Sequence, residues 1–361
     1  METELTRKLG IRYPIFLAPM AGGPTTPELV AAVSNAGGLG SLGAGYLSPE
    51  QLRGAIRAIR ERTDRPFGVN LFVPEQAAES EETIASMNRH LDRYRGELGI
   101  PANPPVRQAS EPFEEQAQVL VEERVPVFSF TFGLPPRELI RSMKRKGIFV
   151  VGTATTVDEA IRAEEAGVDA IVAQGGEAGG HRGTFLKEVS ASMIGTMALV
   201  PQAVDQVSIP VIAAGGIMDG RGLAASLALG AAAAQMGTAF LACPESGAHD
   251  AHKRKLLSSK EDSTEVTRAY SGKAARGIRT KFMSDMERYP GTIPAYPIQN
   301  AMTRDIRQAA AEANNPEYMS LWAGQGLRLA GGRPAADIVR RTVDQADELF
   351  HKLANFGSPT G

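Results

Sequence analysis

The chain has 361 residues, and its 39 Lys and Arg against 41 Asp and Glu give a net charge of −2, which argues against a nucleic-acid-binding or polybasic membrane surface. Its single cysteine, Cys243, excludes a disulfide scaffold and any zinc or iron–sulfur site built from several cysteines. Glycine is over-represented, and 16 of its 38 copies fall in three clusters at residues 22–45, 175–183 and 215–222. Such clusters indicate sharp turns or close approach of backbone to a ligand.

Short apolar runs alternate with amphipathic stretches of helical length along the chain. A parallel strand covered on both faces is apolar throughout, so these runs are predicted to be strands. The eight expected strands are residues 15–20, 39–43, 67–72, 126–130, 148–152, 169–174, 210–214 and 233–238. The expected helices include residues 27–36, 49–62, 135–145, 157–165, 221–229 and 334–355. This alternation predicts an α/β fold, a (β/α)8 TIM barrel, with a doubly wound sheet as the alternative architecture.

Two stretches, residues 74–112 and 244–318, are too long for a simple connection between a strand and a helix. We predict that they pack together as a small, mainly helical cap on the substrate side of the barrel. The barrel would then comprise residues 1–73 and 113–243, with residues 319–361 returning to pack on it.

Two segments could suggest membrane targeting or insertion, the N-terminal residues and one long uncharged run, and neither predicts a membrane protein. Residues 1–5 are acidic and lack the apolar core of a secretory signal, so we expect a cytoplasmic protein. Residues 223–243 carry no charge and have the length of a membrane span. Because Ala and Gly dominate this run and Ser226, Gln235 and Thr238 interrupt it, we predict a buried helix followed by a buried strand instead.

In a TIM barrel, the C-terminal ends of the strands and the loops after them form the active site. Met20 and Gly22 follow the first predicted strand, and Asn70 ends the third. A buried Asn at a strand end can offer a donor and an acceptor to a planar polar ligand. A tight turn and a backbone-capping amide are equally good explanations of these residues taken singly.

The densest polar group, residues 173–183, follows the sixth predicted strand. Gln174 could hydrogen-bond a ring carbonyl or nitrogen, and Gly179 and Gly180 allow the loop to present backbone N–H groups. Of five histidines, only His181 lies inside a glycine loop, where it can act as a base or as a positive charge near an anion. The alternative is an exposed loop histidine. The other four, His90, His249, His252 and His351, are predicted to lie in polar segments without function, and no pair has convincing metal-ligand spacing.

The loops after strands seven and eight of a TIM barrel often hold phosphate. Backbone N–H groups at the ends of the corresponding predicted strands could cradle one, and a threonine hydroxyl could add a donor. These residues are Gly215, Gly216, Gly237 and Thr238. No Walker motif is present and no GxGxxG follows the first strand, so a mononucleotide or sugar phosphate is favoured over a dinucleotide.

These segments together resemble a known family. The sequences at 20–23, 68–72, 174–183, 213–217 and 235–238 are similar to motifs of nitronate monooxygenases, formerly called 2-nitropropane dioxygenases. The similarity continues through residues 271–277, 296–300 and 322–326, covers nearly the whole chain and is nearest to the class I branch. One departure is Lys273, which stands where many relatives are expected to have arginine.

The resemblance implies one FMN, bound non-covalently at the barrel mouth, with His181 as the catalytic residue. It assigns the isoalloxazine or its ribityl chain to Met20, Gly22, Asn70 and Gln174. It assigns the ribityl chain and phosphate to Gly179, Gly180, Gly215, Gly216, Gln235, Met236, Gly237 and Thr238.

The resemblance also implies oxidation of alkyl nitronates, such as propionate 3-nitronate, by O2 to a carbonyl compound and nitrite without NAD(P)H, in the service of detoxification. His181 would orient the anionic nitronate or remove the α-proton of a neutral nitroalkane. Two alternatives remain open. The same glycine–histidine loop occurs in NAD(P)H-dependent FMN reductases that act on quinones or enoyl thioesters, and a cofactor-free phosphate-binding or scaffold barrel is the other. The sequence predicts no oligomeric state.

Overall fold

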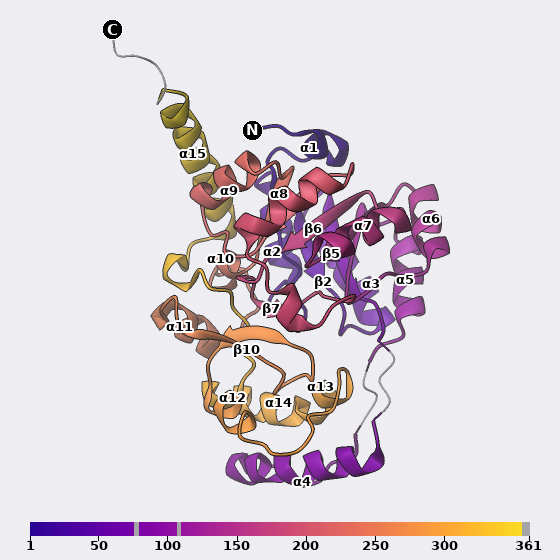
Figure 1. Cartoon of the computed structure of the whole chain (residues 1–361), viewed down its shortest axis with the longest axis vertical. Coiled ribbons are helices and arrows are strands. Elements are labelled where there is room, and N and C mark those ends of the chain that lie inside the picture. The colour runs from indigo at the N-terminus through magenta and orange to yellow at the C-terminus, as the bar shows by residue number, and fades with distance from the viewer. Residues whose placement is uncertain (76–78, 107–109, 356–361) are drawn as a thin grey trace.

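The computed structural model describes residues 1–75, 79–106 and 110–355 and shows a barrel of eight parallel strands (Figure 1). They are neighbours in the order β1-β9-β8-β6-β5-β4-β3-β2, and a parallel bridge between Phe16 and Leu39 brings β1 next to β2. The strands are β1 (Ile15–Leu17), β2 (Gly40–Gly43), β3 (Phe67–Phe72), β4 (Val127–Thr131), β5 (Phe149–Ala154), β6 (Ala170–Gln174), β8 (Val211–Ala214) and β9 (Ala233–Met236). The predicted (β/α)8 barrel is confirmed, and the doubly wound sheet is wrong.

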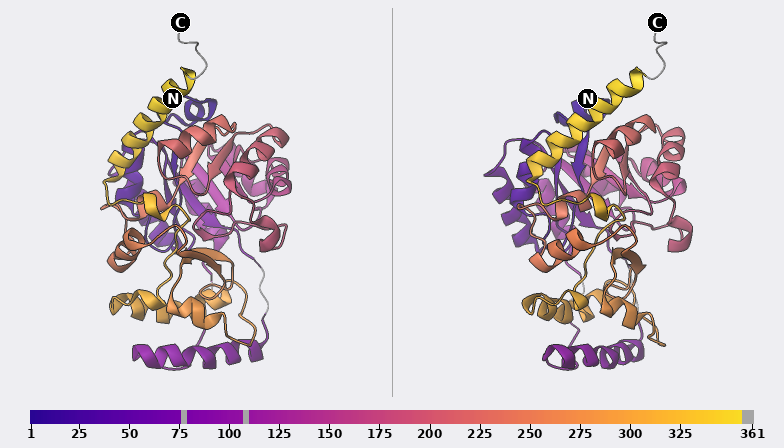
Figure 2. Two further views of the ribbon diagram at one scale, coloured as in Figure 1. Left: turned by 60° about the vertical axis from the view of Figure 1, so that its left-hand side comes forward. Right: turned by 90° about the vertical axis from the view of Figure 1, so that its left-hand side faces the viewer.

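Helices alternate with the strands and surround the barrel (Figure 2). Their starts follow local rules: Thr26, Ser48 and Thr156 each cap a helix by accepting a hydrogen bond from the backbone N–H three residues later. The barrel helices are α2 (Pro27–Asn35), α3 (Pro49–Arg60), α5 (Phe113–Glu122), α6 (Arg137–Arg145), α7 (Val157–Ala166), α8 (Thr196–Gln206) and α9 (Gly220–Ala228).

The uncharged run at residues 223–243 contains part of α9 and the buried strand β9, as the sequence predicts, and then the short helix α10 (Thr238–Leu241), which the sequence did not predict. Across the described ranges, every helix is too short or too polar to traverse a lipid bilayer.

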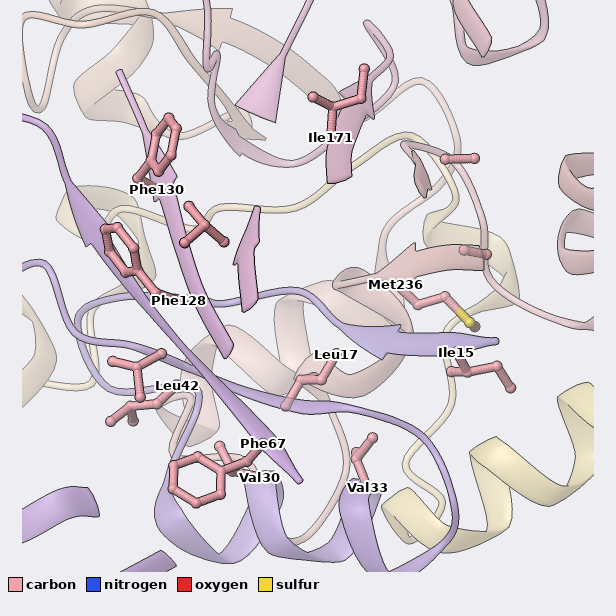
Figure 3. Packing of buried hydrophobic residues seen from close by; sticks show 14 of the residues in the cluster. Ile15, Leu17, Val30, Val33, Leu42, Phe67, Phe128, Phe130, Ile171 and Met236 are labelled. Atoms are coloured by element: carbon pink, nitrogen blue, oxygen red, sulfur yellow. The ribbon is translucent and has the colours of Figure 1, made fainter. Parts of the chain in front are cut away.

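Successive side chains of a strand point to opposite faces of the sheet, so the hydrophobic core has one part between the sheet and its helices and another inside the barrel. Ile15 and Leu17 point outward to the main core cluster between the sheet and its helices (Figure 3), whereas Phe16 between them belongs to the cluster inside the barrel. That inner cluster also contains Leu5 and Leu9 of α1 (Glu4–Leu9), which covers the N-terminal end of the barrel. The C-terminal end is therefore the one that remains accessible to a ligand.

The last helix, α15 (Ala335–Ala354), packs along the barrel and extends beyond it (Figure 1). Its buried residues Val339, Val343 and Ala346 join the main core cluster. Gly220 at the start of α9 makes this contact possible, because a Cβ there would lie 2.5 Å from the backbone nitrogen of Ala346. The sequence predicted that residues 319–361 pack on the barrel, and the last of these, residues 356–361, lie outside the described residues.

The two predicted insertions lie against one another beyond the open end of the barrel (Figures 1 and 2). Met87 and Leu91 of the first share a second core cluster with Phe282 and Ile306 of the second. The elements of the insertions are α4 (Glu81–Leu98), α11 (Asp250–Ser258), β10 (Thr264–Thr267), β11 (Ala275–Ile278), α12 (Lys281–Met286), α13 (Ile298–Met302) and α14 (Arg304–Glu312). The shared core supports our division of the chain into barrel and cap, which stays a proposal; β10 and β11 are elements that the sequence did not predict.

Arg95 joins α4 to α14 through a fully buried guanidinium. Its Nε donates to Asp305 Oδ2 and its Nη1 to Asp92 Oδ1, both at 2.8 Å. Because Arg95→Met removes the hydrogen bonds to Asp92, to Asp305 and to the carbonyl of Met302 together, it is expected to lower the free energy of unfolding by about 3 kcal/mol. Chemical denaturation measures it. The control Arg93→Met removes a half-exposed arginine of the same helix and is expected to cost less than about 1 kcal/mol; equal losses in both variants would contradict the anchoring role.

Candidate active site

A cavity of about 660 Å³ opens at the C-terminal ends of the barrel strands and is closed from above by α11, α13, α14 and residues 319–326. It brings together almost all residues that the sequence singled out. Those that line it are Met20, Gly22, Asn70, Gln174, Gly179, Gly180, His181, Gly215, Gly216, Gln235, Gly237 and Thr238. Met236 is the exception, because its side chain is buried near Ile15 in the main core cluster, between the sheet and its helices (Figure 3).

His181 does not lie in a free loop, as the glycines around it suggest. It forms with Gly180 the two-residue strand β7 (Gly180–His181), which pairs antiparallel with β11 so that Ala275 lies opposite His181. Strand β11 pairs in turn with β10, which completes a three-stranded sheet. A segment of the second insertion therefore holds the candidate catalytic residue in register above the barrel.

Two buried arginines hold the loop that leads to His181. Arg182, fully buried, donates from Nη1 to the carbonyl of Gly175 at 2.7 Å and from Nη2 to the carbonyl of Ser192 at 2.8 Å. Arg276 donates from Nη2 to the carbonyl of Gly176 at 2.9 Å. These bonds give the carbonyls of Ser192 and Gly176 a donor, add a second donor to the carbonyl of Gly175, and fix the backbone in the cavity wall.

Gln174 acts on the same loop. Its Nε2 donates to the carbonyl of His181 at 3.1 Å, and its Oε1 accepts from the backbone N–H of Gly183 at 2.9 Å. One amide hydrogen remains for a ligand, because Nε2 carries two. The side chain thus orients His181 whatever else it contacts.

Ser271 is the hydrogen-bond partner of His181, with 2.8 Å between Nε2 and Oγ. The Ser271 hydroxyl also lies 3.0 Å from the carbonyl of Lys273, to which it can donate. A hydroxyl has one proton, so when that proton goes to Lys273, the bond to His181 runs from Nε2–H to Oγ and Nδ1 carries the lone pair. When the hydroxyl turns toward Nε2, the proton of the neutral ring is on Nδ1.

His181 is neutral in this site. Burial, together with the positive charges of Lys273 and Arg307, lowers its pKa to about 3. Aromatic rings surround it, with centroids 5.4 Å away for Trp322, 5.6 Å for Phe132 and 6.0 Å for Tyr296. Of the two protonation states that the sequence allowed, the free protein therefore holds the imidazole rather than the imidazolium.

The glycines after β8 and β9 present unused donors. Across residues 1–75, 79–106 and 110–355, the N–H groups of Gly215, Gly216 and Gly237 have no hydrogen-bond partner. Gly215 and Gly216 adopt φ of +119° and +71°, which side chains rarely allow. Thr238 Oγ1 accepts from the N–H of Gly324 at 2.9 Å, so its own proton is free to donate. This set of donors suits an anion such as a phosphate.

Asn70 lies on the opposite side of the barrel mouth, at the end of β3. It is buried, and its Nδ2 donates to Ser129 Oγ at 3.0 Å. The carbonyl oxygen of its amide is left to accept from a ligand N–H group. The cavity thus has anion donors at one end and a planar polar contact at the other.

The second insertion adds positive charge to the cavity. Arg304 and Arg307 of α14 line it, and neither forms an ion pair with a carboxylate among the described residues. Arg307 is held by Asn300, to whose carbonyl its Nη2 donates at 2.8 Å, while its Nη1 has no partner in the described structure. Lys273, by contrast, is paired with Glu75.

Sequence reasoning missed several of these residues as site residues. Ser271 and Trp322 lie in segments that carry the family resemblance, but no local pattern shows that they contact His181. Arg307 lies in an ordinary amphipathic helix, and nothing in its spacing distinguishes it from a solvent-exposed arginine. These roles depend on contacts between distant parts of the chain.

Known proteins resemble this chain over nearly its whole length. A family model described as "Nitronate monooxygenase" matches residues 2–345. A probable nitronate monooxygenase of Staphylococcus aureus strain MSSA476 is 50% identical over 351 residues, which cover 97% of this chain and 98% of that protein. Among solved structures, nitroalkane oxidase from Streptomyces ansochromogenes has a TM-score of 0.90 and 40% identity, covering 97% of this chain and 99% of its own. FabK from Thermotoga maritima has a TM-score of 0.78 and 34% identity, covering 99% of both chains.

Proposed function

Because this chain belongs to the nitronate monooxygenase family, we propose that it is an FMN-dependent enzyme that oxidises alkyl nitronates with O2 to a carbonyl compound and nitrite, without NAD(P)H. Family membership supports the broader class, an oxidoreductase of the monooxygenase type. The observation that carries the proposal is one cavity that joins backbone N–H donors, a neutral His181 and two arginines, with the donors and the arginines lacking hydrogen-bond or ion-pair partners, respectively, in the part of the chain that the structure describes.

The cavity fits FMN by its donor set. The free N–H groups of Gly215, Gly216 and Gly237, with the Thr238 hydroxyl, suit the phosphate. The side chain of Glu177 also lies close to Gly216. Its carboxylate accepts hydrogen bonds from the backbone N–H and the hydroxyl of Thr196, so it is bound by protein donors and does not use those that suit the phosphate. Asn70 and the remaining amide hydrogen of Gln174 suit the polar edge of an isoalloxazine. FMN supplies the redox chemistry when bound, and the protein supplies position and charge.

The hydroxyl of Ser271 lets His181 serve two kinds of substrate. With the Ser271 proton on the Lys273 carbonyl, Nδ1 of His181 has a lone pair and can take the α-proton of a neutral nitroalkane. With that proton turned to Nε2, Nδ1–H donates to a nitro oxygen of an anionic nitronate. In both cases the ring stays neutral before the substrate arrives.

The arginines of α14 favour an anionic substrate that has a second negative group. Arg307 Nη1 has no partner in the described structure, and its neighbour Arg304 lines the same cavity. A guanidinium presented in this way suits a carboxylate. This arrangement supports propionate 3-nitronate as a substrate.

Ser271→Ala removes the hydroxyl that sets the protonation of His181 Nε2. We expect kcat for a nitronate to fall about 10-fold, because a charge-assisted or buried hydrogen bond contributes about this much. Steady-state kinetics are measured with a nitronate and with its parent nitroalkane at several pH values. We expect the ratio of the activity with the nitronate to the activity with the nitroalkane to change, while flavin stays bound. An unchanged ratio would reduce Ser271 to a structural role, and Ser271→Thr, which keeps a hydroxyl, is the matched control.

One assay separates the proposed function from its alternatives. The purified full chain is given propionate 3-nitronate and air without nicotinamide, and oxygen uptake and nitrite are followed. We expect both, together with bound flavin near one per chain. Rapid anaerobic bleaching of that flavin by NADH or NADPH, without nitronate turnover, would establish the FMN reductase instead. A colourless protein that takes up no flavin would leave the phosphate-binding or scaffold barrel. The cytoplasmic location and the detoxification role stay predictions from the sequence.

A further inference from the structure

The indole of Trp322, the single tryptophan of the chain, forms part of the cavity wall beside His181. The centroids of the two rings are 5.4 Å apart. The chain neighbours Leu321 and Ala323 are each only 1% exposed, whereas Trp322 is half-buried. The accessible surface at this point of the chain therefore belongs to Trp322, which lines the cavity.

The indole is fixed in this position by packing. Trp322 forms an antiparallel bridge with Gly277, where a Cβ would lie 2.9 Å from Cε3 of the indole. The ring of Tyr270 is nearly perpendicular to the indole, with 5.6 Å between the centroids. Tyr270 is itself held, because its hydroxyl donates to the carbonyl of Met319 at 2.7 Å. A side chain enclosed in this way keeps one orientation toward His181.

The N–H of this indole is available to a ligand. An indole nitrogen can only donate, and it usually has an acceptor when it is buried. Within residues 1–75, 79–106 and 110–355, Nε1 of Trp322 donates to no protein atom, and it is not one of the buried side-chain atoms that lack a partner. Nε1 therefore combines an unused proton with accessible surface.

A nitronate needs more than one such donor. Its negative charge is shared by two oxygens on one nitrogen, and a charge removed from water is stable only where donors replace the water. The neutral ring of His181 has one N–H, so with the Ser271 proton turned to Nε2 it can serve only one of the two oxygens. The other oxygen needs a donor close to His181, and the indole of Trp322 is the neighbouring ring that has one.

We propose, on the basis of the nitronate oxidation proposed above, that Nε1–H of Trp322 donates a hydrogen bond to one nitronate oxygen while Nδ1–H of His181 donates to the other. Trp322 is then a substrate-binding residue that recognises the nitronate group itself rather than the alkyl chain.

The single tryptophan allows a direct test, because 15N-labelled tryptophan gives one indole N–H signal in the NMR spectrum of the FMN-loaded full chain. The probe is nitrite, which has the same charge on two oxygens of one nitrogen. We expect nitrite to shift the indole proton downfield in a saturable way, and chloride at equal concentration to leave it in place. The shift should persist in Arg307→Met, which removes a competing anion donor. An unmoved indole signal in both chains would overturn the proposal.

Trp322→Phe keeps an aromatic ring and removes the donor. We expect kcat/KM for propyl-1-nitronate to fall about 10-fold, as the loss of a hydrogen bond to a charged group requires. Phe72→Leu is the matched control, because Phe72 lines the same cavity without a donor, and it should cost less than about 2-fold.

Equal losses in Trp322→Phe and Phe72→Leu would reduce the indole to packing. That result, like an unmoved indole signal, overturns the role of Trp322 and leaves the proposed function in place. A wild-type chain that fails to oxidise nitronates would overturn the proposed function and, with it, the nitronate as the anion at Trp322, even if nitrite shifts the indole signal.

Discussion

Replacing His181 by Asn is expected to lower kcat/KM for a nitronate by a factor of about 10² to 10⁴ while FMN stays bound. The imidazole lies in the cavity wall and can give or take a proton, and it is held by Ser271, by Gln174 and by the β7–β11 pairing. Asparagine keeps a polar group near Nδ1 but cannot act as a base. Initial rates with nitrite detection, and the flavin absorbance of the purified variant, measure the two parts of the expectation.

The pH dependence sharpens this test. The pKa of His181 is lowered to about 3, so the neutral ring is present throughout the range in which the enzyme can be assayed. Activity that depends on the neutral form should therefore persist as the pH rises from 5 to 8, and should be lost only as the pH falls toward the lowered pKa. If imidazolium were the working form, kcat/KM would instead fall as the pH rises through the ordinary range of histidine. Full activity of His181→Asn, or such a fall, would remove His181 from its proposed role.

The barrel could be predicted from the sequence because its signals are local. Each strand is a short apolar run, and the glycine loops follow strand ends that any closed parallel sheet brings to one edge. Gly216, Gly237 and Thr238 could thus be placed together without any knowledge of the packing. The side chain of Met236 lies outside the cavity lining for a local reason as well: side chains alternate along a strand, and this one falls on the face that packs against the helices, so its contact with the cofactor stays a prediction.

The surroundings of His181 could not be predicted, because they arise from pairing between distant segments. Ala275 lies opposite His181 across a two-residue strand that no propensity scale would detect. Ser271 reaches the ring from 90 positions away in the chain. His252 was set aside because it lies in a polar helical segment, yet the fold buries it. In each case the local pattern is ordinary, and tertiary contacts decide the role.

Replacing Arg307 by Met should change substrate choice more than it changes turnover in general. We expect kcat/KM for propionate 3-nitronate to fall about 10- to 100-fold, which corresponds to the loss of a charge-assisted hydrogen bond to its carboxylate. For propyl-1-nitronate, which has no carboxylate, the fall should stay below about 3-fold. We expect an effect on one substrate only because Asn300 fixes the guanidinium of Arg307, while Nη1 of Arg307 has no partner in the described structure. Parallel steady-state kinetics with the two nitronates measure it.

Arg304→Met is the matched control, because Arg304 lines the same cavity from the same helix but is exposed, and no partner within the described ranges fixes it. Solvent screens an exposed charge, so this variant should lose less than about 3-fold with either substrate. Arg307→Lys should recover part of the lost activity, since it restores the charge but not the fork of donors. If kcat/KM for the two nitronates fell equally in Arg307→Met, the guanidinium would act on the whole cavity through its charge or its packing, and the carboxylate of the substrate would be bound elsewhere. A selective loss would instead place the carboxylate end of the substrate against α14 and its nitronate end at His181.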